Sequence, residues 1–267
     1  MLTLFTTPKP FKGHIAIIQR NAIRSWTLLK PACEIILFGD EEGAREAAEE
    51  MGVRHVSSLQ RNDRGTPLLN DLFDQARRLA SNEILGCINA DIILMDDFVQ
   101  AVRQVLSWRL RFLMVGQRRN LNIDRTLNFG PGWEERLKKQ VDEEGEFYTG
   151  IDYFVFPRNL WGQIPPFAVG RFYWDNWLLY GARLRKAAVV DCTQAVTAVH
   201  QNHDYAHFSN HIEDAAKSSE ARLNRELLGG ARNCFTTFEA THQLTLQGIR
   251  SRCRGCYPVC VCMLGPT

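Results

Sequence analysis

The chain has 267 residues, of which 45% are hydrophobic, so it is long enough to bury a core and is not disordered as a whole. Its 32 lysines and arginines nearly balance 30 aspartates and glutamates, which excludes the strongly basic surface that binds nucleic acid or anionic membranes. We therefore expect small molecules or neutral polymers as partners, and no nucleic acid. No basic segment followed by an apolar run opens the sequence, and no window is apolar enough to cross a bilayer; this predicts a cytoplasmic protein without a transmembrane segment.

In the first half of the chain, short β-rich runs alternate with helical periods. Strands are predicted over 2–7, 34–41, 53–56 and 83–94, and helices over 15–29, 44–51 and 66–79. The strand over 83–94 is apolar on both faces, as a central parallel strand should be, and only Asn89 and Asp91 interrupt it. A helix from Asp96 or Asp97 to about Leu106 and a strand over 111–116 follow.

The second half begins with a polar stretch over 117–149, which is either an active-site lid or acceptor loop, or a surface insertion. Strands over 150–157 and 187–190 flank a helix through Trp174, and an apolar run over 195–199 leads into His200. This alternation predicts an α/β fold with a mostly parallel central sheet and helices on both faces. We find no internal repeat.

Ligands of open α/β sheets bind at the carboxyl ends of the strands, so the polar residues there are candidates for a site. Asp91 stands out, because a carboxylate in such apolar surroundings is costly to bury without a partner or a metal. A nucleotide-diphosphate sugar needs hydrogen bonds to its base and ribose, a divalent cation and a base for the acceptor hydroxyl. The strand ends offer candidates for each: Thr6, Thr7, Asp40, Asn89, Asp91 and His200.

Three segments resemble those of the GT-A glycosyltransferases, particularly the family-two-like ones, within about residues 1–205. Leu37-Phe-Gly-Asp-Glu-Glu-Gly is similar to the second strand whose terminal acid holds the base or ribose. The run from Gly65 to Ile88-Asn-Ala-Asp is similar to the glycine, helix and strand that end in a DxD-like motif. Phe172-Tyr-Trp-Asp-Asn-Trp resembles the acid-containing helix start that supplies the catalytic base.

The resemblance implies a GT-A (Rossmann-like) transferase that moves a sugar from a UDP- or GDP-sugar to a hydroxyl of a carbohydrate or other acceptor, with inversion. Asp91, His200 and His203 would hold Mn²⁺ or Mg²⁺. Asp175 would be the catalytic base, and Asp152 would read hydroxyls of the donor sugar or the acceptor. The nucleotide would be bound by Thr6, Thr7, Asp40, Arg64 and Asn89. The catalytic domain would cover 1–208, a helical extension 209–250, and a cysteine-rich, flexible tail 251–267.

Two departures from the family pattern keep another class of function open. Asn89 replaces the first acid of the DxD motif, and Trp174 replaces the first acid of the usual pair before the catalytic helix. A GT-A-like protein that has lost acids could instead be an inactive carbohydrate-binding or scaffold protein. A sugar nucleotidyltransferase is disfavoured, because no glycine-rich loop follows the first strand.

Each site residue also has a purely structural alternative. Asp91 could cap the next helix, and Asp40 and Asp175 could be acids at helix starts. The histidines at 200, 203 and 207 could belong to a surface loop. Arg61 and Arg64 either grip phosphate or lie in a solvated loop. Four aromatic residues either stack on sugar rings or belong to the core: Trp161, Tyr173, Trp174 and Trp177.

Seven of the eight cysteines fall into two groups. Three of them lie singly in apolar runs and are expected to be buried thiols: Cys33, Cys87 and Cys192. Four crowd the end of the chain: Cys253, Cys256, Cys260 and Cys262. These four either bind a thiophilic metal or form a redox-sensitive tail, and their spacing is tighter than in common zinc sites.

Overall fold

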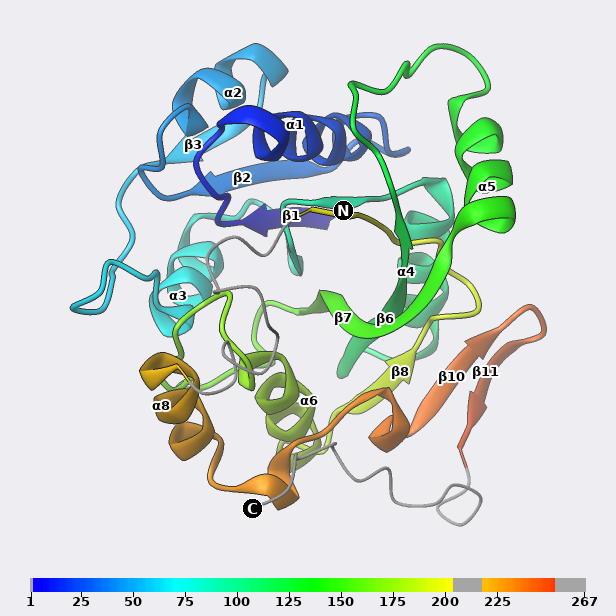
Figure 1. The fold of residues 1–267 in the computed structure, drawn as a ribbon. Helices are drawn as coiled ribbons and strands as arrows, with labels where there is room; N and C mark the ends of the chain where they lie inside the picture. Colours follow the sequence, from blue (N-terminus) through cyan, green and yellow to red (C-terminus); the bar gives the residue numbers. More distant parts are fainter. Residues whose placement is uncertain (1, 204–217, 253–267) are drawn as a thin grey trace.

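A computed structural model describes residues 2–203 and 218–252, whose strands form one eleven-stranded sheet (Figure 1). The strand order is β11-β10-β8-β6-β7-β4-β1-β2-β3, while β9 pairs with β5 and with β6. The strands are β1 Leu2–Thr6, β2 Glu34–Phe38, β3 Arg54–Val56, β4 Ile84–Ile88, β5 Ile92–Ile93, β6 Phe112–Leu121, β7 Glu146–Pro157, β8 Ala188–Asp191, β9 Val199–Gln201, β10 His242–Thr245 and β11 Gly248–Ser251.

Most of the sheet is parallel, which confirms the predicted fold class. Strands β4, β1, β2 and β3 run parallel on one side, and β6, β8 and β10 run parallel on the other. Strand β7 lies antiparallel between β4 and β6 and joins the two halves. The carboxyl ends of β1, β2 and β4 therefore meet at one edge, where the sequence predicts the site.

Helices cover both faces of the sheet. On one face, Trp26 of α1 (Gly13–Thr27) and Phe98 of α4 (Asp96–Trp108) are fully buried, and α2 (Ala44–Met51) packs in the same core. On the other face lie α3 (Leu69–Leu79) and α6 (Trp174–Leu184). Helix α3 buries Leu69, Leu72, Phe73 and Ala76, the i, i+3, i+4, i+7 stripe of an amphipathic helix. None of the described helices has both the length and the apolar character to span a membrane.

The structure differs from the sequence prediction at two places near the site. The strand predicted over 83–94 is interrupted after Ile88, where the backbone N–H of Ile92 donates to the carbonyl of Asn89 and closes a turn. The polar stretch over 117–149 is not an irregular loop: it lengthens β6, contains α5 (Trp133–Glu144) and begins β7. Its polarity arises because most of it lies at the surface rather than in the core.

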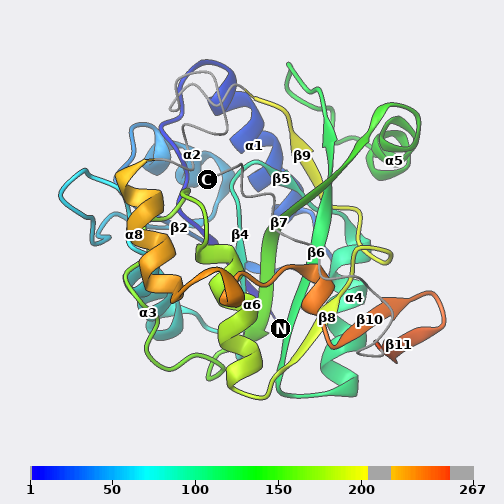
Figure 2. The ribbon, with the colours of Figure 1, turned by 60° about the horizontal axis from the view of Figure 1, so that its bottom comes forward.

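The described part of the chain after residue 217 packs against the sheet domain. Helix α8 (Ser219–Leu228) lies beside α6 and near α3 (Figure 2), and the side chain of Ser218 caps its first turn. Buried Asn224 of α8 exchanges hydrogen bonds with the backbone of Ala168 and also donates to the carbonyl of Phe172. Two 3₁₀ turns, Ala231–Asn233 and Thr237–Glu239, then lead to β10, which extends the sheet. The predicted tail from 253 lies outside the described residues.

Candidate active site

Asp91 lies in the turn between β4 and β5, and the short strand β5 places two histidines beside it. Ile92, the residue after Asp91, pairs with His200 across the antiparallel β5–β9 contact. His203 follows β9 by two residues. The backbone of Asp91 is itself fixed, because its carbonyl accepts a hydrogen bond from the side chain of Gln201.

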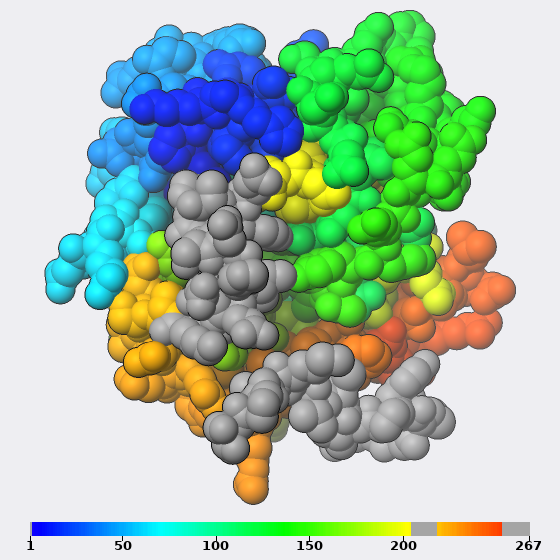
Figure 3. All heavy atoms as spheres, viewed as in Figure 1, coloured from blue at the N-terminus to red at the C-terminus, as the bar shows by residue number. Residues whose placement is uncertain are grey.

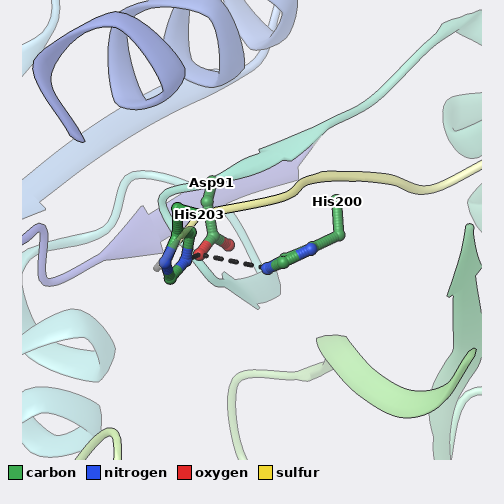
Figure 4. A group of neighbouring side chains, drawn as sticks. All are labelled: Asp91, His200 and His203. Carbon is green, nitrogen blue, oxygen red and sulfur yellow. Dashed lines mark hydrogen bonds and ion pairs between the residues drawn. The ribbon is translucent and has the colours of Figure 1, made fainter. Parts of the chain in front are cut away.

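The side chains of Asp91, His200 and His203 converge (Figure 4). Nε2 of His203 lies 3.0 Å from Oδ2 of Asp91, and Nε2 of His200 lies 3.7 Å from the same oxygen. One potential ligand atom from each residue lies within 4.8 Å of the others. Oδ1 of Asp91 is buried and has no hydrogen-bond partner among the residues that the structure describes. A carboxylate and two imidazoles with such an unsatisfied oxygen form a group that could hold a divalent metal ion.

The charges around this group favour the protonation states that bind a metal. Burial alone would raise the pKa of Asp91, but the hydrogen bond from His203 and the charges of His200 and Lys9 hold it far below the usual range. Burial lowers the pKa of His200 and outweighs the opposing effect of Asp91. At neutral pH the site therefore offers a carboxylate and, at His200, a neutral imidazole, both of which are required of metal ligands.

A second polar group adjoins the first on β7. Asp152 is buried, and its Oδ1 accepts a hydrogen bond of 2.5 Å from Nδ2 of Asn89. Its Oδ2 is 2.8 Å from a guanidinium nitrogen of Arg118 in an ion pair whose two side chains are each less than a tenth exposed. The Asn89 amide thus holds Asp152. The ion pair with Arg118 fixes the orientation of the Asp152 carboxyl group.

Asp175 lies in the first turn of α6, after Tyr173, whose backbone adopts a left-handed φ of 86°. Burial, followed by the nearby charge of Asp152, raises the pKa of Asp175 to about 6, although backbone N–H donors partly oppose this. A carboxylate with a raised pKa accepts a proton more readily than an ordinary one. Of the two acids predicted to be catalytic, Asp175 has the properties of a general base.

Three of the five residues predicted to bind the nucleotide lie at the ends of β1 and β2, while Asn89 follows β4 and Arg64 lies in the loop before α3. Thr6 is buried, and the hydroxyl of Thr7 is buried without a hydrogen-bond partner among the described residues. Asp40 is exposed and pairs with Arg61 at 2.7 Å, and Arg61 also binds Glu41 at 2.8 Å. The glycine before Asp40 has φ 112°, and a side chain there would collide with Glu41. Of the three residues at the ends of β1 and β2, only Asp40 therefore presents its polar group to solvent.

Arg64 is exposed, and within residues 2–203 and 218–252 only its backbone N–H has a hydrogen bond, to Asn62. The arginine that binds the acids at this edge is Arg61. The role predicted for Arg64 stays a prediction.

Sequence reasoning missed a lysine and an arginine near this edge. Lys9 follows β1, is half-buried and has no ion-pair partner within the part of the chain described. Burial lowers its pKa, Asp91 opposes this, and Arg171 adds to it. Arg171 binds Glu220 of α8 at 2.8 Å. The signal in the sequence was the position of Lys9 directly after a strand that ends in two threonines, whereas Arg171 and Glu220 meet only in the folded chain.

Two predictions about aromatic residues and cysteines have a clear outcome. The indoles of Trp161, Trp174 and Trp177 are 5–8% exposed and pack in the core, so stacking of sugars on them is wrong. Trp174 and Trp177 follow helical spacing because both lie in α6, which buries them in the core that it shares with the sheet. Cys87 and Cys192 are buried as expected, and burial raises the pKa of each thiol. Cys33 is only half-buried, and the predictions for His207 and the C-terminal cysteines fall outside the described residues.

The surface near the candidate metal group is formed by segments far apart in sequence. In Figure 3 the yellow atoms around residue 200 reach the surface between the blue N-terminal residues and the green segment that follows β6. The N-terminal strands thus flank the group on one side, and β6 and β7 flank it on the other.

No family model matches the chain, and neither does any curated protein sequence. Solved structures do match it. Glucosyl-3-phosphoglycerate synthase from Mycobacterium tuberculosis, in complex with Mn²⁺, UDP and phosphoglyceric acid, is 15% identical over 88% of this chain and 79% of its own, with a TM-score of 0.52. The same enzyme with Mn²⁺ and UDP-glucose is 15% identical over 86% of this chain and 80% of its own, with a TM-score of 0.53. S. aureus TarS with UDP-GlcNAc is 10% identical over 86% of this chain and 67% of its own, with a TM-score of 0.53. The chain therefore has the fold of the GT-A glycosyltransferases, as its sequence predicted.

Proposed function

We propose that this protein is a metal-dependent glycosyltransferase that uses a UDP-sugar as donor. The observation that carries the proposal is the group of Asp91, His200 and His203 at the carboxyl edge of a GT-A sheet. The three similar structures named above contain UDP, UDP-glucose or UDP-GlcNAc, and the two of the mycobacterial enzyme also contain Mn²⁺. These ligands favour a UDP-sugar as donor over a GDP-sugar, the other donor that the sequence analysis considered.

The donor would lie across the ends of β1, β2 and β4. Thr6, Thr7 and Asp40 would bind the base and ribose, as the sequence predicts. Asp91 and the two histidines would hold the cation, whose charge stabilises a departing diphosphate. The charge of Asp91 acts on Lys9, but the Lys9 ammonium forms no ion pair with any described residue, so it could bind a phosphate oxygen.

On the acceptor side, Asp175 would take the proton from the attacking hydroxyl. Its pKa of about 6 leaves it ionised at neutral pH, yet basic enough to accept a proton during the reaction. Asp152 is held in place by Asn89 and Arg118, and would orient a hydroxyl through a remaining lone pair. Direct attack assisted by a base inverts the anomeric centre, so we propose inversion, and a retained configuration in the product would overturn it.

The test of the proposed function is the thermal stability of the protein with UDP, GDP, CDP or dTDP, each with and without Mn²⁺. A ligand at a hundred times its dissociation constant adds about 2.7 kcal/mol, and each kcal/mol raises Tm by about 2–4 °C in a protein of this size. We expect a shift with UDP that requires Mn²⁺ and is lost in Asp91→Ala.

The matched control is Asp142→Ala, which removes an exposed acid of α5 and should keep the shift. If no nucleotide gives a metal-dependent shift, the transferase proposal fails, and the inactive binding or scaffold protein becomes the better hypothesis.

A further inference from the structure

Two arginines of β6 stack on two aromatic residues of β7. The guanidinium carbon of Arg118 lies 4.5 Å from the centre of the Tyr148 ring, and that of Arg119 lies 3.8 Å from the centre of the Phe147 ring. These pairs are also register partners in the antiparallel β6–β7 ladder. Successive side chains of a strand point to opposite faces, so the two stacked pairs lie on opposite faces of the sheet.

The pair of Arg118 and Tyr148 lies on the face that carries the candidate site. Arg118 binds Asp152, and the charge of Arg118 helps to lower the pKa of His200. The charge of Asp152 in turn helps to raise the pKa of Asp175 in α6. The other pair faces α5, where Arg119 donates to the carbonyls of Val141 and Gly145.

The Tyr148 ring is packed against Arg118 and Gly150, yet the residue remains partly exposed. A Cβ atom at Gly150 would lie 3.0 Å from the ring and 3.4 Å from the guanidinium carbon of Arg118, so the missing side chain lets both pack closely. Tyr148 nevertheless keeps 41% of its surface exposed. The ring thus stacks on a guanidinium that also binds a buried carboxylate, which combines an apolar surface with a carboxylate that can accept hydrogen bonds from hydroxyls.

These are the two contacts that a pyranose ring requires. Its C–H face stacks on an aromatic ring, and its hydroxyls bind carboxylates. The position favours the acceptor over the donor, because β6 and β7 lie on one side of β4 and the strands predicted to bind the nucleotide lie on the other. The candidate metal group lies between them.

We propose that Tyr148 is the platform on which a sugar ring of the acceptor stacks, and that the acceptor of this enzyme is therefore a carbohydrate. The identification of this sugar as the acceptor rests on the proposed function, but the binding of a sugar to Tyr148 can be measured separately. Phe147 offers a matched control, since it is another exposed aromatic residue stacked on an arginine, one position away and on the opposite face.

The probe is an array of oligosaccharides, screened with labelled protein in the presence of UDP and Mn²⁺, followed by titration of the best-binding glycan. We expect Tyr148→Ala to lower the affinity for that glycan at least tenfold, which corresponds to about 1.4 kcal/mol. Tyr148→Phe and Phe147→Ala should stay within about twofold. Tyr148→Leu, which keeps bulk but not the aromatic ring, should behave like Tyr148→Ala, and the affinity for UDP should not change in any variant.

The outcomes separate this inference from the proposed function. If UDP with Mn²⁺ stabilises the protein but no glycan binds, or if Phe147→Ala weakens glycan binding as much as Tyr148→Ala, the platform is refuted and the transferase proposal stands. A tenfold loss of UDP affinity in Tyr148→Ala would also refute it, because the ring would then serve the donor. Glycan binding that needs Tyr148 in a protein that binds no nucleotide would support the platform and refute the transferase.

Discussion

Replacing Asp175 with asparagine should stabilise the protein at neutral pH and stop transfer. The folded state raises the pKa of this carboxyl from 3.8 to about 6, and one pKa unit corresponds to about 1.4 kcal/mol. The ionised group thus destabilises the fold by up to about 3 kcal/mol, and contact with solvent reduces the expected gain in Asp175→Asn to about 2 kcal/mol. Asparagine keeps an oxygen that accepts hydrogen bonds from the backbone N–H groups of α6.

The pH dependence gives the sign of the effect. Because the pKa of Asp175 is raised on folding, wild type loses stability relative to Asp175→Asn as the pH rises from about 4 to above 6. The advantage of the variant should be largest at pH 7.5, about half as large at pH 5 and absent below the unfolded pKa. Urea denaturation at each pH measures it, with Asp142→Asn as an exposed control expected to stay within about 0.5 kcal/mol.

The activity of the same variant completes the test. Without a base, turnover should fall by at least about a hundredfold, and wild-type kcat/KM should decline below pH 6 as Asp175 becomes protonated. The reasoning is refuted if Asp175→Asn is less stable than wild type at pH 7.5, if its advantage does not depend on pH, or if it transfers sugar at the wild-type rate.

Two further predictions concern groups that support the site. Arg118→Met should lower the free energy of unfolding by about 3–5 kcal/mol, since it leaves the buried carboxylate of Asp152 without its cation. Arg118→Met/Asp152→Asn should recover part of this loss, and a double variant no more stable than Arg118→Met would contradict the assignment. Glu220→Ala should cost about 2 kcal/mol, because Arg171 and Asn62 lose their shared carboxylate. Because hydrogen bonds from Thr66, Asn62 and Arg171 lower the pKa of Glu220 from its ordinary value of 4.5, wild type should lose its advantage over Glu220→Ala progressively on acidification below that value; an advantage that does not shrink at all on acidification would argue against it.

The strand-helix alternation could be predicted from the sequence because each element of the sheet domain has its own periodicity. The stripe of α3 and the two-sided apolar strand β4 are local signals; α3 appears where the pattern places it, and β4 forms the first part of the predicted strand. The stretch over 117–149 failed for the opposite reason. Helix α5 and the ends of β6 and β7 are largely exposed, so few apolar residues mark their period, and the sequence looks like a loop.

The metal group could be predicted only in part, because its residues come together through contacts between distant parts of the chain. Asp91 was conspicuous as a carboxylate in an apolar strand, and the histidines were conspicuous as a cluster, but their meeting depends on the β5–β9 pairing. Neither the partnership of Arg118 with Asp152 nor the exposure of Tyr148 leaves a trace in local sequence. Residues 34 positions apart form that ion pair because β6 and β7 are antiparallel neighbours.

Asn89 illustrates how a departure from a motif becomes intelligible in three dimensions. Judged as a member of a DxD-like motif, it is a missing charge and a sign of lost activity. In the structure its side-chain amide donates to Asp152 at 2.5 Å, and an aspartate there would place two carboxylates in direct contact. Such a pair cannot stay ionised without another cation. His203 and His200 complete the candidate metal group without residue 89, so the asparagine is free to link the turn that carries Asp91 to the strand that carries the acceptor-side residues.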